Sequence, residues 1–200
     1  MKALIIGASG TIGKAIVAEL RGDTDIVAAS LNNKAQKVDM GDHSSIRQLL
    51  ERVGKLDAII CAAARGVIFK SITDMSTDDY NLSLQQKFFG QVCISLEGIK
   101  YLNDGGSITL TTGILNRHLV KNGSAAAIAN NAVEAFVKSA SLDLPRGIRI
   151  NAVSPALLEE SALKYKDLCP GFETVSSNKV ARAYRKSVYG IESGKVFHVN

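Results

Sequence analysis

The sequence predicts an α/β protein with a doubly wound, mostly parallel sheet of the Rossmann-like class, formed by residues 1–200 as a single domain. Apolar strand-like runs alternate with segments of helical periodicity along the whole chain. The first of these runs passes through a glycine-rich turn straight into a helical period. Composition does not shift along the 200 residues, and 46% apolar with 22% charged residues is typical of one globular domain.

The N-terminal segment, residues 2–19, carries a nucleotide-binding pattern. Gly7, Gly10 and Gly13 follow the continuous apolar run of residues 3–6 at three-residue spacing. A strand that turns through glycines into a helix aims free N–H groups and the positive end of the helix dipole at a phosphate. The three glycines allow, in turn, the tight bend, the approach of a pyrophosphate and close helix–strand packing. The pattern predicts dinucleotide binding; an ordinary strand-turn-helix built from small residues is the alternative.

The next segments leave one feature of the sheet open. Residues 25–30 are expected to form the second strand, and only a short stretch separates them from residues 37–40. A parallel crossover normally needs a dozen or more residues. Either a crossover helix has been lost here, or residues 37–40 are only an extended segment at the edge of the sheet. Asp42 or Ser44 then caps a helix that Gly54 ends.

The remaining elements follow from apolar periodicity and from glycine and proline stops. In order, we expect a strand over residues 56–61, a long helix capped by Thr77 or Asp78 and reaching Leu102, a stop over 103–106, a strand over 107–112, an alanine-rich helix from Ser124 to about Leu142, a strand over 148–153, short helices over 159–166 and 178–188, and a final strand over 195–199. Strand and helix thus alternate throughout, as in an open sheet covered on both faces.

Composition argues against several classes of protein. Cys61, Cys93 and Cys169 are odd in number and far apart, which fits free thiols in a reducing cytoplasm and gives no metal-ligand spacing. No stretch approaches the length of a membrane span, and the N-terminus is read as a core strand, not a secretion signal. The net charge of +5 is modest, and the basic cluster over 179–186 lacks interleaved aromatic residues. We therefore expect a cytoplasmic protein without nucleic-acid or membrane partners.

The most specific pattern in the chain is R-I-N-A-V-S-P at residues 149–155, followed by Ala156. The glycines of residues 7–13 are spaced G-x-x-G-x-x-G, residues 56–64 form a buried strand that runs into alanines, and residues 194–199 form a closing strand. In this order the motifs resemble the short-chain dehydrogenase/reductase family over essentially the whole chain. The first is close to the family's R-x-N-x-x-x-P-G, and the glycine spacing is similar to that of its extended and divergent members.

The resemblance implies a dinucleotide site at the carboxyl edge of the sheet. Asp39 matches the family's acidic residue that meets the adenine amino group. The expected cofactor contacts are Gly7, Ser9, Gly10, Thr11, Ile12, Gly13, Ser30, Asn32, Lys34, Asp39, Met40, Ala62, Ala63, Ala64, Lys87, Pro155 and Leu157.

The end of the second strand favours NADP over NAD. An enzyme that selects NAD usually places an acid there to hold the ribose 2′-hydroxyl. Here the stretch is S-L-N-N-K at residues 30–34, without an acid. A carboxylate would repel a 2′-phosphate, whereas Ser30, Asn32 and Lys34 can bond and neutralise it. An ordinary polar loop is the alternative.

The family's catalytic pair, Tyr-x-x-x-Lys on the helix after the fourth long strand, is missing. Alignment of that helix places Ala126 at the tyrosine and Asn130 at the lysine. Alanine transfers no proton, and Asn130 can bond a ribose hydroxyl but has no charge to tune a pKa. Lys87 falls near the family's helical asparagine. We expect it to point inward and to transfer a proton or hold the ribose, with a solvent-facing lysine as the alternative.

Thr112 and Ser124 complete the candidate catalytic set of Lys87, Thr112, Ser124 and Asn130. Thr112 ends a strand at the carboxyl edge, where ligands bind in such sheets. Its alternative is a plain strand threonine, and that of Ser124 is a helix N-cap. His118 lies in a loop near the expected pocket rim, where most histidines are simply solvated. The short segment 156–177 predicts an open or small pocket.

Two functions remain open at this point. The first is an NADP-dependent oxidoreductase that passes hydride to or from a small carbonyl or alcohol compound with a non-standard proton donor. The second is a catalytically inactive NADP(H)-binding sensor or regulatory protein, which the loss of the tyrosine and lysine favours. The helices over 77–102 and 124–142 resemble the pair through which family members pack into dimers, so a homo-oligomer, dimer or tetramer, is expected.

Overall fold

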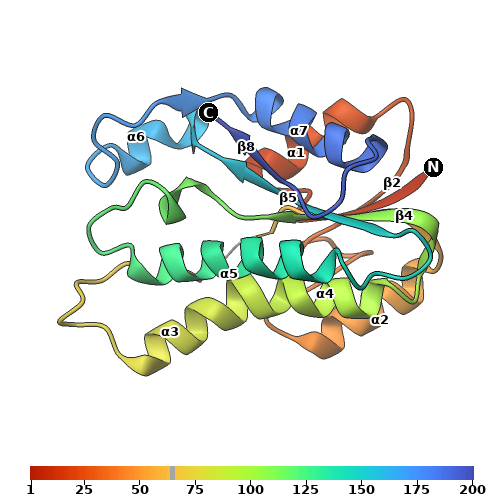
Figure 1. Cartoon of the computed structure of the whole chain (residues 1–200), viewed down its shortest axis with the longest axis horizontal. Helices are drawn as coiled ribbons and strands as arrows, with labels where there is room; N and C mark the ends of the chain where they lie inside the picture. The colour runs from red at the N-terminus through yellow and green to blue at the C-terminus, as the bar shows by residue number, and fades with distance from the viewer. Residues whose placement is uncertain (64–65) are drawn as a thin grey trace.

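The computed structural model describes residues 1–63 and 66–200, so the predicted nucleotide contact Ala64 lies outside the described residues. At its centre is a six-stranded sheet in the order β2-β1-β3-β4-β5-β8, with parallel pairing throughout (Figure 1). Its strands are β1 Lys2–Ile6, β2 Asp25–Ala29, β3 Leu56–Cys61, β4 Leu102–Thr111, β5 Arg149–Pro155 and β8 Val196–Val199. The doubly wound, Rossmann-like class is confirmed.

Helices cover both faces of this sheet. They are α1 Thr11–Leu20, α2 His43–Val53, α3 Thr77–Leu84, α4 Gly90–Gly98, α5 Ser124–Ala140, α6 Ala162–Tyr165 and α7 Ser177–Tyr189. Figure 1 shows α1 and α7 on one side of the sheet and α2, α4 and α5 on the other. Within the described part of the chain, no helix is long and apolar enough to cross a membrane.

The strand order reverses beside β1. β2 pairs with β1 on one side and β3 pairs with it on the other. The chain runs from β1 through α1 to β2, and then returns through α2 to β3 on the far side of β1. In open sheets of this type, ligands bind in the crevice at the reversal, beyond the carboxyl ends of the strands. From the fold, a ligand site is therefore expected beyond the ends of β1 and β3, at Ile6 and Cys61.

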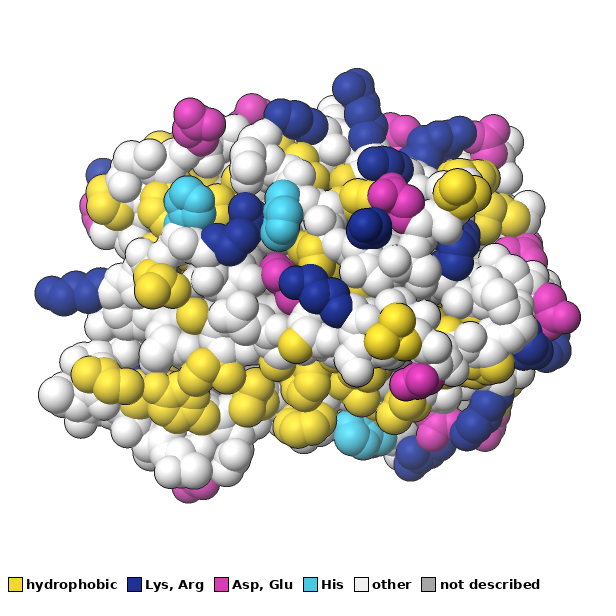
Figure 2. Space-filling model, viewed as in Figure 1, with side chains coloured by type: hydrophobic (Ala, Val, Ile, Leu, Met, Phe, Trp, Pro, Cys, Tyr) yellow, Lys and Arg dark blue, Asp and Glu magenta, His cyan; other side chains and the backbone are white. Residues whose placement is uncertain are grey.

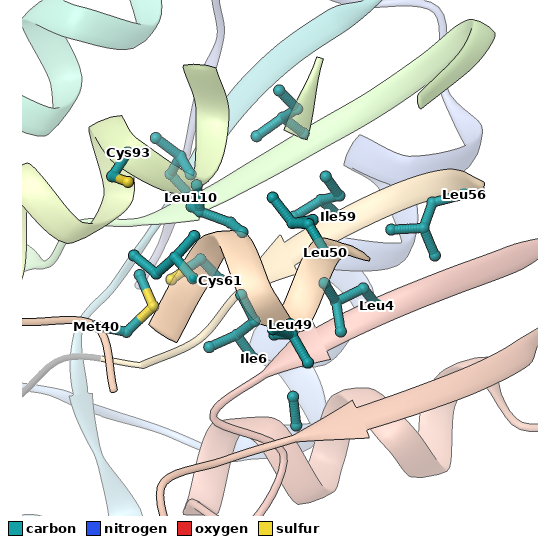
Figure 3. Packing of buried hydrophobic residues seen from close by; sticks show 14 of the residues in the cluster. Leu4, Ile6, Met40, Leu49, Leu50, Leu56, Ile59, Cys61, Cys93 and Leu110 are labelled. Atoms are coloured by element: carbon teal, nitrogen blue, oxygen red, sulfur yellow. The ribbon is translucent and has the colours of Figure 1, made fainter. Parts of the chain in front are cut away.

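The core has two halves, one on each face of the sheet. Leu4 and Ile6 pack into the cluster under α2, α4 and α5, which Figure 3 shows from close by. Ala3 and Ile5 pack into the cluster under α1 and α7. A strand buried on both faces shows no polar alternation, which explains the continuous apolar run at the start of the sequence.

The short connection after β2 is an extended segment, the second of the two alternatives. Lys37 makes a single parallel bridge to Ser30, next to β2 at the edge of the sheet. α2 supplies the crossover to β3. Asp42 caps this helix, accepting a hydrogen bond from the N–H of Ser44 at 2.8 Å, and Gly54 ends it with φ +71°. Both residues were among those predicted for these roles.

The predicted long helix is continuous from Thr77, but it ends at Gly98 instead of Leu102 and is not α-helical throughout. α3 passes into a π-helix, Gln85–Phe89, before α4 ends at Gly98. The predicted stop at 103–106 is also wrong, because these residues belong to β4. The pairing of β3 with β4 shifts register here, so the stretch forms an irregularity within the strand that local composition does not distinguish from a turn.

Two helix caps also differ from those predicted. Ser76, not Thr77 or Asp78, caps α3: its Oγ accepts from the N–H of Asp79 at 3.2 Å, and Asp79 bonds back to the Ser76 N–H. α5 is capped by Gly123, and Ser124 is its first residue. The N-cap alternative for Ser124 is therefore wrong.

Candidate functional site

A cleft of about 160 Å³ lies at the strand reversal between β1 and β3. Its lining consists of Ile6, Gly7, Ser9, Gly10, Ser30, Leu31, Val38, Asp39, Met40, Ala62, Ala63 and Gln86. Eight of the seventeen predicted cofactor contacts are thus brought together: Gly7, Ser9, Gly10, Ser30, Asp39, Met40, Ala62 and Ala63. Leu31, Val38 and Gln86 were missed, because their place at the cleft comes from tertiary packing and no motif marks them.

The glycine turn forms one wall of this cleft by close backbone contact. Gly7 has φ +85°, and a Cβ there would lie 2.8 Å from the backbone nitrogen of Ala63. A Cβ on Gly13 would lie 2.1 Å from the carbonyl oxygen of Gly7. Gly10 lines the cleft and immediately precedes α1. No side chain caps that helix, so the first-turn N–H groups around Thr11, next to Gly10, have no side-chain acceptor. Backbone donors at a helix N-terminus suit a phosphate.

Basic residues gather beside the Asp39 end of the cleft. Lys34 lines a neighbouring surface hollow together with Lys37 and Arg52, and this hollow shares Asp39 with the cleft. Arg52 had no signal in the sequence, because α2 brings it there from a distance. Asn32, by contrast, lies exposed in the turn and lines neither cavity.

A second cavity, of about 380 Å³, opens at the carboxyl edge of the sheet between the glycine turn, the ends of β4 and β5, and α5. It is lined by Ile12, Gly66, Val67, Phe69, Lys87, Gly113, Ile114, Leu115, Ala126, Asn130, Pro155, Ala156, Leu157, Leu158, Ser161, Tyr165, Leu168, Cys169 and Phe172. Five predicted site residues meet here: Ile12, Lys87, Asn130, Pro155 and Leu157. The other predicted site residues do not line this cavity.

Lys87 reaches this second cavity from the π-helix. Its side chain is buried, with 9% of its surface exposed, so the solvent-facing alternative is wrong. Among residues 1–63 and 66–200 its ammonium has neither an ion-pair partner nor a hydrogen-bond acceptor. Burial without a compensating charge disfavours the protonated form and lowers the pKa of Lys87 to about 8.

Asn130 and Ala126 stand on α5 at the same cavity, where the family places its lysine and tyrosine. The Nδ2 of Asn130 donates to the carbonyl of Gly113 at 3.1 Å. Its Oδ1 is buried and has no hydrogen-bond partner among the described residues. A buried acceptor without a partner is costly unless a ligand supplies the donor. Asn130 therefore carries an unsatisfied acceptor next to the cavity.

Gln91 holds the π-helix against the sheet. Its Nε2 donates to the carbonyl of Lys87 at 2.8 Å and to the carbonyl of Thr111 at 3.0 Å, and its Oε1 accepts from the N–H of Thr111 at 2.8 Å. A π-helix leaves backbone groups in need of such partners and is common at functional sites. No pattern in the sequence marks this role, because an amide on an apolar helix face has no motif that distinguishes it.

Thr112 and Ser124 do not line the second cavity. The Thr112 hydroxyl is buried and donates to the carbonyl of Asn130 at 3.1 Å. The Ser124 hydroxyl pairs with that of Tyr80 at 2.9 Å, on the side of α5 that faces another hollow. His118 packs edge-on against Phe172, a cavity-lining residue, with ring centroids 5.8 Å apart.

The segment after β5 forms the outer wall of the cavity. Two short strands, β6 Leu157–Leu158 and β7 Thr174–Val175, pair in parallel and close the base of this segment. Between them a 3₁₀ turn, Glu159–Ser161, leads into α6, close to the predicted short helix. In the described part of the chain no cluster of His, Cys, Asp and Glu could hold a metal ion.

The two glycines of the turn are expected to respond differently to alanine. Gly13→Ala forces a Cβ against backbone atoms and should cost about 1–3 kcal/mol of stability, because backbone cannot yield as a side chain can. Gly10→Ala meets its first neighbour at 3.4 Å and should leave the melting temperature nearly unchanged. Thermal denaturation of both variants measures this, and equal losses would contradict the packing described here.

Lys87→Met is expected to stabilise the protein at neutral pH. The ammonium loses about 3 kcal/mol on burial, because its pKa falls from 10.5 to about 8. This penalty is complete below pH 8 and fades as the pH rises toward 10.5, where the unfolded chain also loses the proton. Denaturation at pH 7 and pH 10 should show that Lys87→Met raises the stability less at pH 10 than at pH 7. The exposed Lys138→Met serves as control, and a gain of the same size there, or none at position 87, would refute the prediction.

The structure is similar to solved structures over its whole length. The protein lin1944 from Listeria innocua is 42% identical, with a TM-score of 0.97 and complete coverage of both chains. A structure described as a small-chain dehydrogenase in complex with NADPH is 26% identical, with a TM-score of 0.88, and covers 100% of this chain and 96% of that one. These likenesses confirm the Rossmann-like α/β fold.

Curated relatives point to the same family. Versicolorin reductase stcU of Emericella nidulans is 28% identical over 89% of this chain and 77% of its own length. The NADPH-dependent enoyl-[acyl-carrier-protein] reductase FabI of Staphylococcus aureus is 26% identical over 80% of this chain and 64% of its own length. Residues 11–190 match a family model described as enoyl-(acyl carrier protein) reductase. The chain thus belongs to the short-chain dehydrogenase/reductase family of oxidoreductases.

Proposed function

We propose that the protein is an NADP(H)-dependent oxidoreductase that transfers hydride between the cofactor and a small carbonyl or alcohol compound, with Lys87 in place of the missing tyrosine. The observation that carries this proposal is the buried side chain of Lys87, which lines the second cavity together with Asn130 and has no partner among the described residues. A lysine with a pKa near 8 can both give and take a proton at neutral pH.

The residues present fit a dinucleotide. The Gly7 to Gly13 turn forms a cradle that a Cβ would fill, and the cleft beside it carries Asp39 for the adenine amino group. Pro155 and Leu157 line the second cavity, where the nicotinamide half would lie. The buried Oδ1 of Asn130, which has no partner in the described part of the chain, supplies an acceptor for a ribose hydroxyl.

NADP is the proposed cofactor in preference to NAD. Ser30 lines the cleft and Lys34 the adjoining hollow, where basic side chains can neutralise a 2′-phosphate. The structural relative in complex with NADPH supports the same choice.

In the direction of reduction, bound NADPH supplies the hydride that goes to the carbonyl carbon. The Lys87 ammonium lies within a mostly apolar wall, where a charge interacts more strongly with a developing alkoxide than it does in water. It donates a proton from Nζ to that oxygen, which completes the alcohol. Lys87 then regains a proton from solvent, and oxidation follows the same path in reverse.

The alternative, an NADP(H)-binding sensor without turnover, rests on the loss of the family's pair. Ala126 and Asn130 stand on α5 where the tyrosine and lysine belong, and neither transfers a proton. Thr112 and Ser124 do not line this cavity, so Lys87 is the remaining predicted donor there. Among the predicted donors, the two functions therefore separate on Lys87.

We further propose a homo-oligomer, a dimer in the simplest case. Phe89, Leu96 and Ile128 are exposed on the π-helix, α4 and α5. Figure 2 shows hydrophobic side chains in a band over α3, α4 and α5. Ala125 and Ala129 on α5 are buried within the monomer and so are not part of this exposed surface. A cytoplasmic location is proposed as well, because Cys61, Cys93 and Cys169 are free thiols.

Turnover and its pH dependence test the role of Lys87. With NADPH and a panel of carbonyl compounds, Lys87→Met should lower kcat/KM by a factor of about 100 or more while NADPH fluorescence still reports binding. Wild-type reduction should slow as the pH rises through about 8, since the proton donor is then lost. Lys138→Met serves as the control. NADPH binding without turnover in the wild type would support the sensor, and no binding of NADPH or NADH would exclude both functions.

Charge reversal tests the cofactor preference. Lys34→Glu should weaken NADPH binding by about tenfold or more and leave NADH binding nearly unchanged, because only NADPH carries the 2′-phosphate. Lys55→Glu makes the same change in net charge next to the amino end of β3 and controls for long-range effects. Equal losses for both nucleotides would argue against a 2′-phosphate contact at Lys34.

A further inference from the structure

The second cavity has an apolar wall and one polar end. Apart from the residues at its polar end, the side chains that line it are mostly aliphatic or aromatic. They come from the start of α1, the loop after β3, the loop after β4 and the outer wall segment: Ile12, Val67, Phe69, Ile114, Leu115, Leu157, Leu158, Leu168 and Phe172. A ligand in this cavity would therefore contact hydrocarbon over most of its surface.

The polar end of the lining comprises Lys87 and Asn130, from the π-helix and α5, two elements that pack together. Lys87 is the single charged side chain among the described lining residues. Away from this end, Ser161, Tyr165 and Cys169 supply the only polar side-chain atoms in the described lining. No described carboxylate or guanidinium faces the cavity, so a second charged group on the ligand would find no partner of opposite charge there.

The lining discriminates between classes of carbonyl compound. A sugar or other polyol would leave several hydroxyl groups against hydrocarbon, and each unpaired group costs free energy. A compound with a carboxylate would direct that group to Lys87 and so displace the carbonyl from the proton donor. An apolar aldehyde or ketone meets neither obstacle, because its single polar atom is the oxygen that Lys87 protonates.

The volume sets an approximate size. An engineered apolar cavity of about 150 Å³ holds a benzene ring. At about 380 Å³, the cavity holds roughly two bodies of that size. The nicotinamide ring would occupy the part near Ile12 and Pro155, which leaves room for one ring or a short alkyl chain beside Leu168 and Phe172.

We propose that the substrate is an uncharged, apolar carbonyl compound with an aryl or short alkyl body, held by hydrocarbon contacts and oriented by its oxygen at Lys87. This inference rests on the proposed function for the reaction, whereas the shape and chemistry of the binding site stand on the cavity itself. It follows that an apolar monocarboxylate such as benzoate should occupy the same site as an inhibitor, with its carboxylate at Lys87.

The experiment compares acetophenone with dihydroxyacetone as oxidants of NADPH, and measures benzoate binding to the NADPH-loaded protein by calorimetry. Acetophenone should exceed dihydroxyacetone in kcat/KM by about a hundredfold or more, and benzoate should inhibit competitively. Leu168→Asn places an amide in the apolar wall. It should therefore weaken the binding of acetophenone and benzoate and leave the binding of NADPH unchanged. Leu163→Asn makes the same change on a neighbouring leucine that is 89% exposed and does not line the cavity, and should leave all three unaffected.

The outcomes separate the substrate class from the reaction. If dihydroxyacetone is reduced as well as acetophenone, the proposed substrate class is wrong while the oxidoreductase function stands. If neither is reduced but benzoate binds and Leu168→Asn alone weakens it, the site chemistry holds and hydride transfer fails. If benzoate does not bind, or if both leucine variants weaken it equally, the proposed site is overturned.

Discussion

Close backbone contact at the glycine turn is the constraint on which the rest of the structure depends. The ends of β1 and β3 and the start of α1 approach so tightly that a single methyl group on Gly13 would overlap the carbonyl of Gly7. Gly7 in turn lies against the backbone of Ala63. The cleft opens on one side of this contact, at Gly10, and the second cavity on the other, at Ile12. The relative placement of the two cavities is therefore set by backbone and not by adjustable side chains.

The π-helix makes the second link between the cavities. Gln86 lines the cleft and Lys87, the next residue, lines the second cavity. Their position is fixed by Gln91, which bonds to the Lys87 carbonyl and to the backbone of Thr111 in β4. A buried amide with its partners satisfied is worth more than its individual bonds suggest, because loss of one partner leaves the other groups unpaired. Gln86 and Lys87 are thus held in place by the sheet as well as by their own helix.

The fold could be read from the sequence because its signals are local. A strand buried on both faces, a glycine turn and the Asp42 cap each fit within a few residues, and the cleft residues follow from the turn. The π-helix could not be predicted from the sequence, since its bonding pattern depends on the contact of Gln91 with Thr111 in β4, twenty residues further along the chain. The same holds for Gln86 and for the outer wall of the cavity, which tertiary packing alone brings to the site.

The burial of Lys87 bears on the choice between the two functions. Its cost of about 3 kcal/mol is a large share of the 5–15 kcal/mol that stabilises a typical domain. A protein that only bound a nucleotide would need the glycine turn, Asp39 and the basic residues near Lys34, and would use Lys87 only to hold the ribose. A proton donor benefits from a place in an apolar cavity, because exclusion of water strengthens its interaction with a developing alkoxide. The placement of Lys87 therefore favours hydride chemistry over nucleotide sensing.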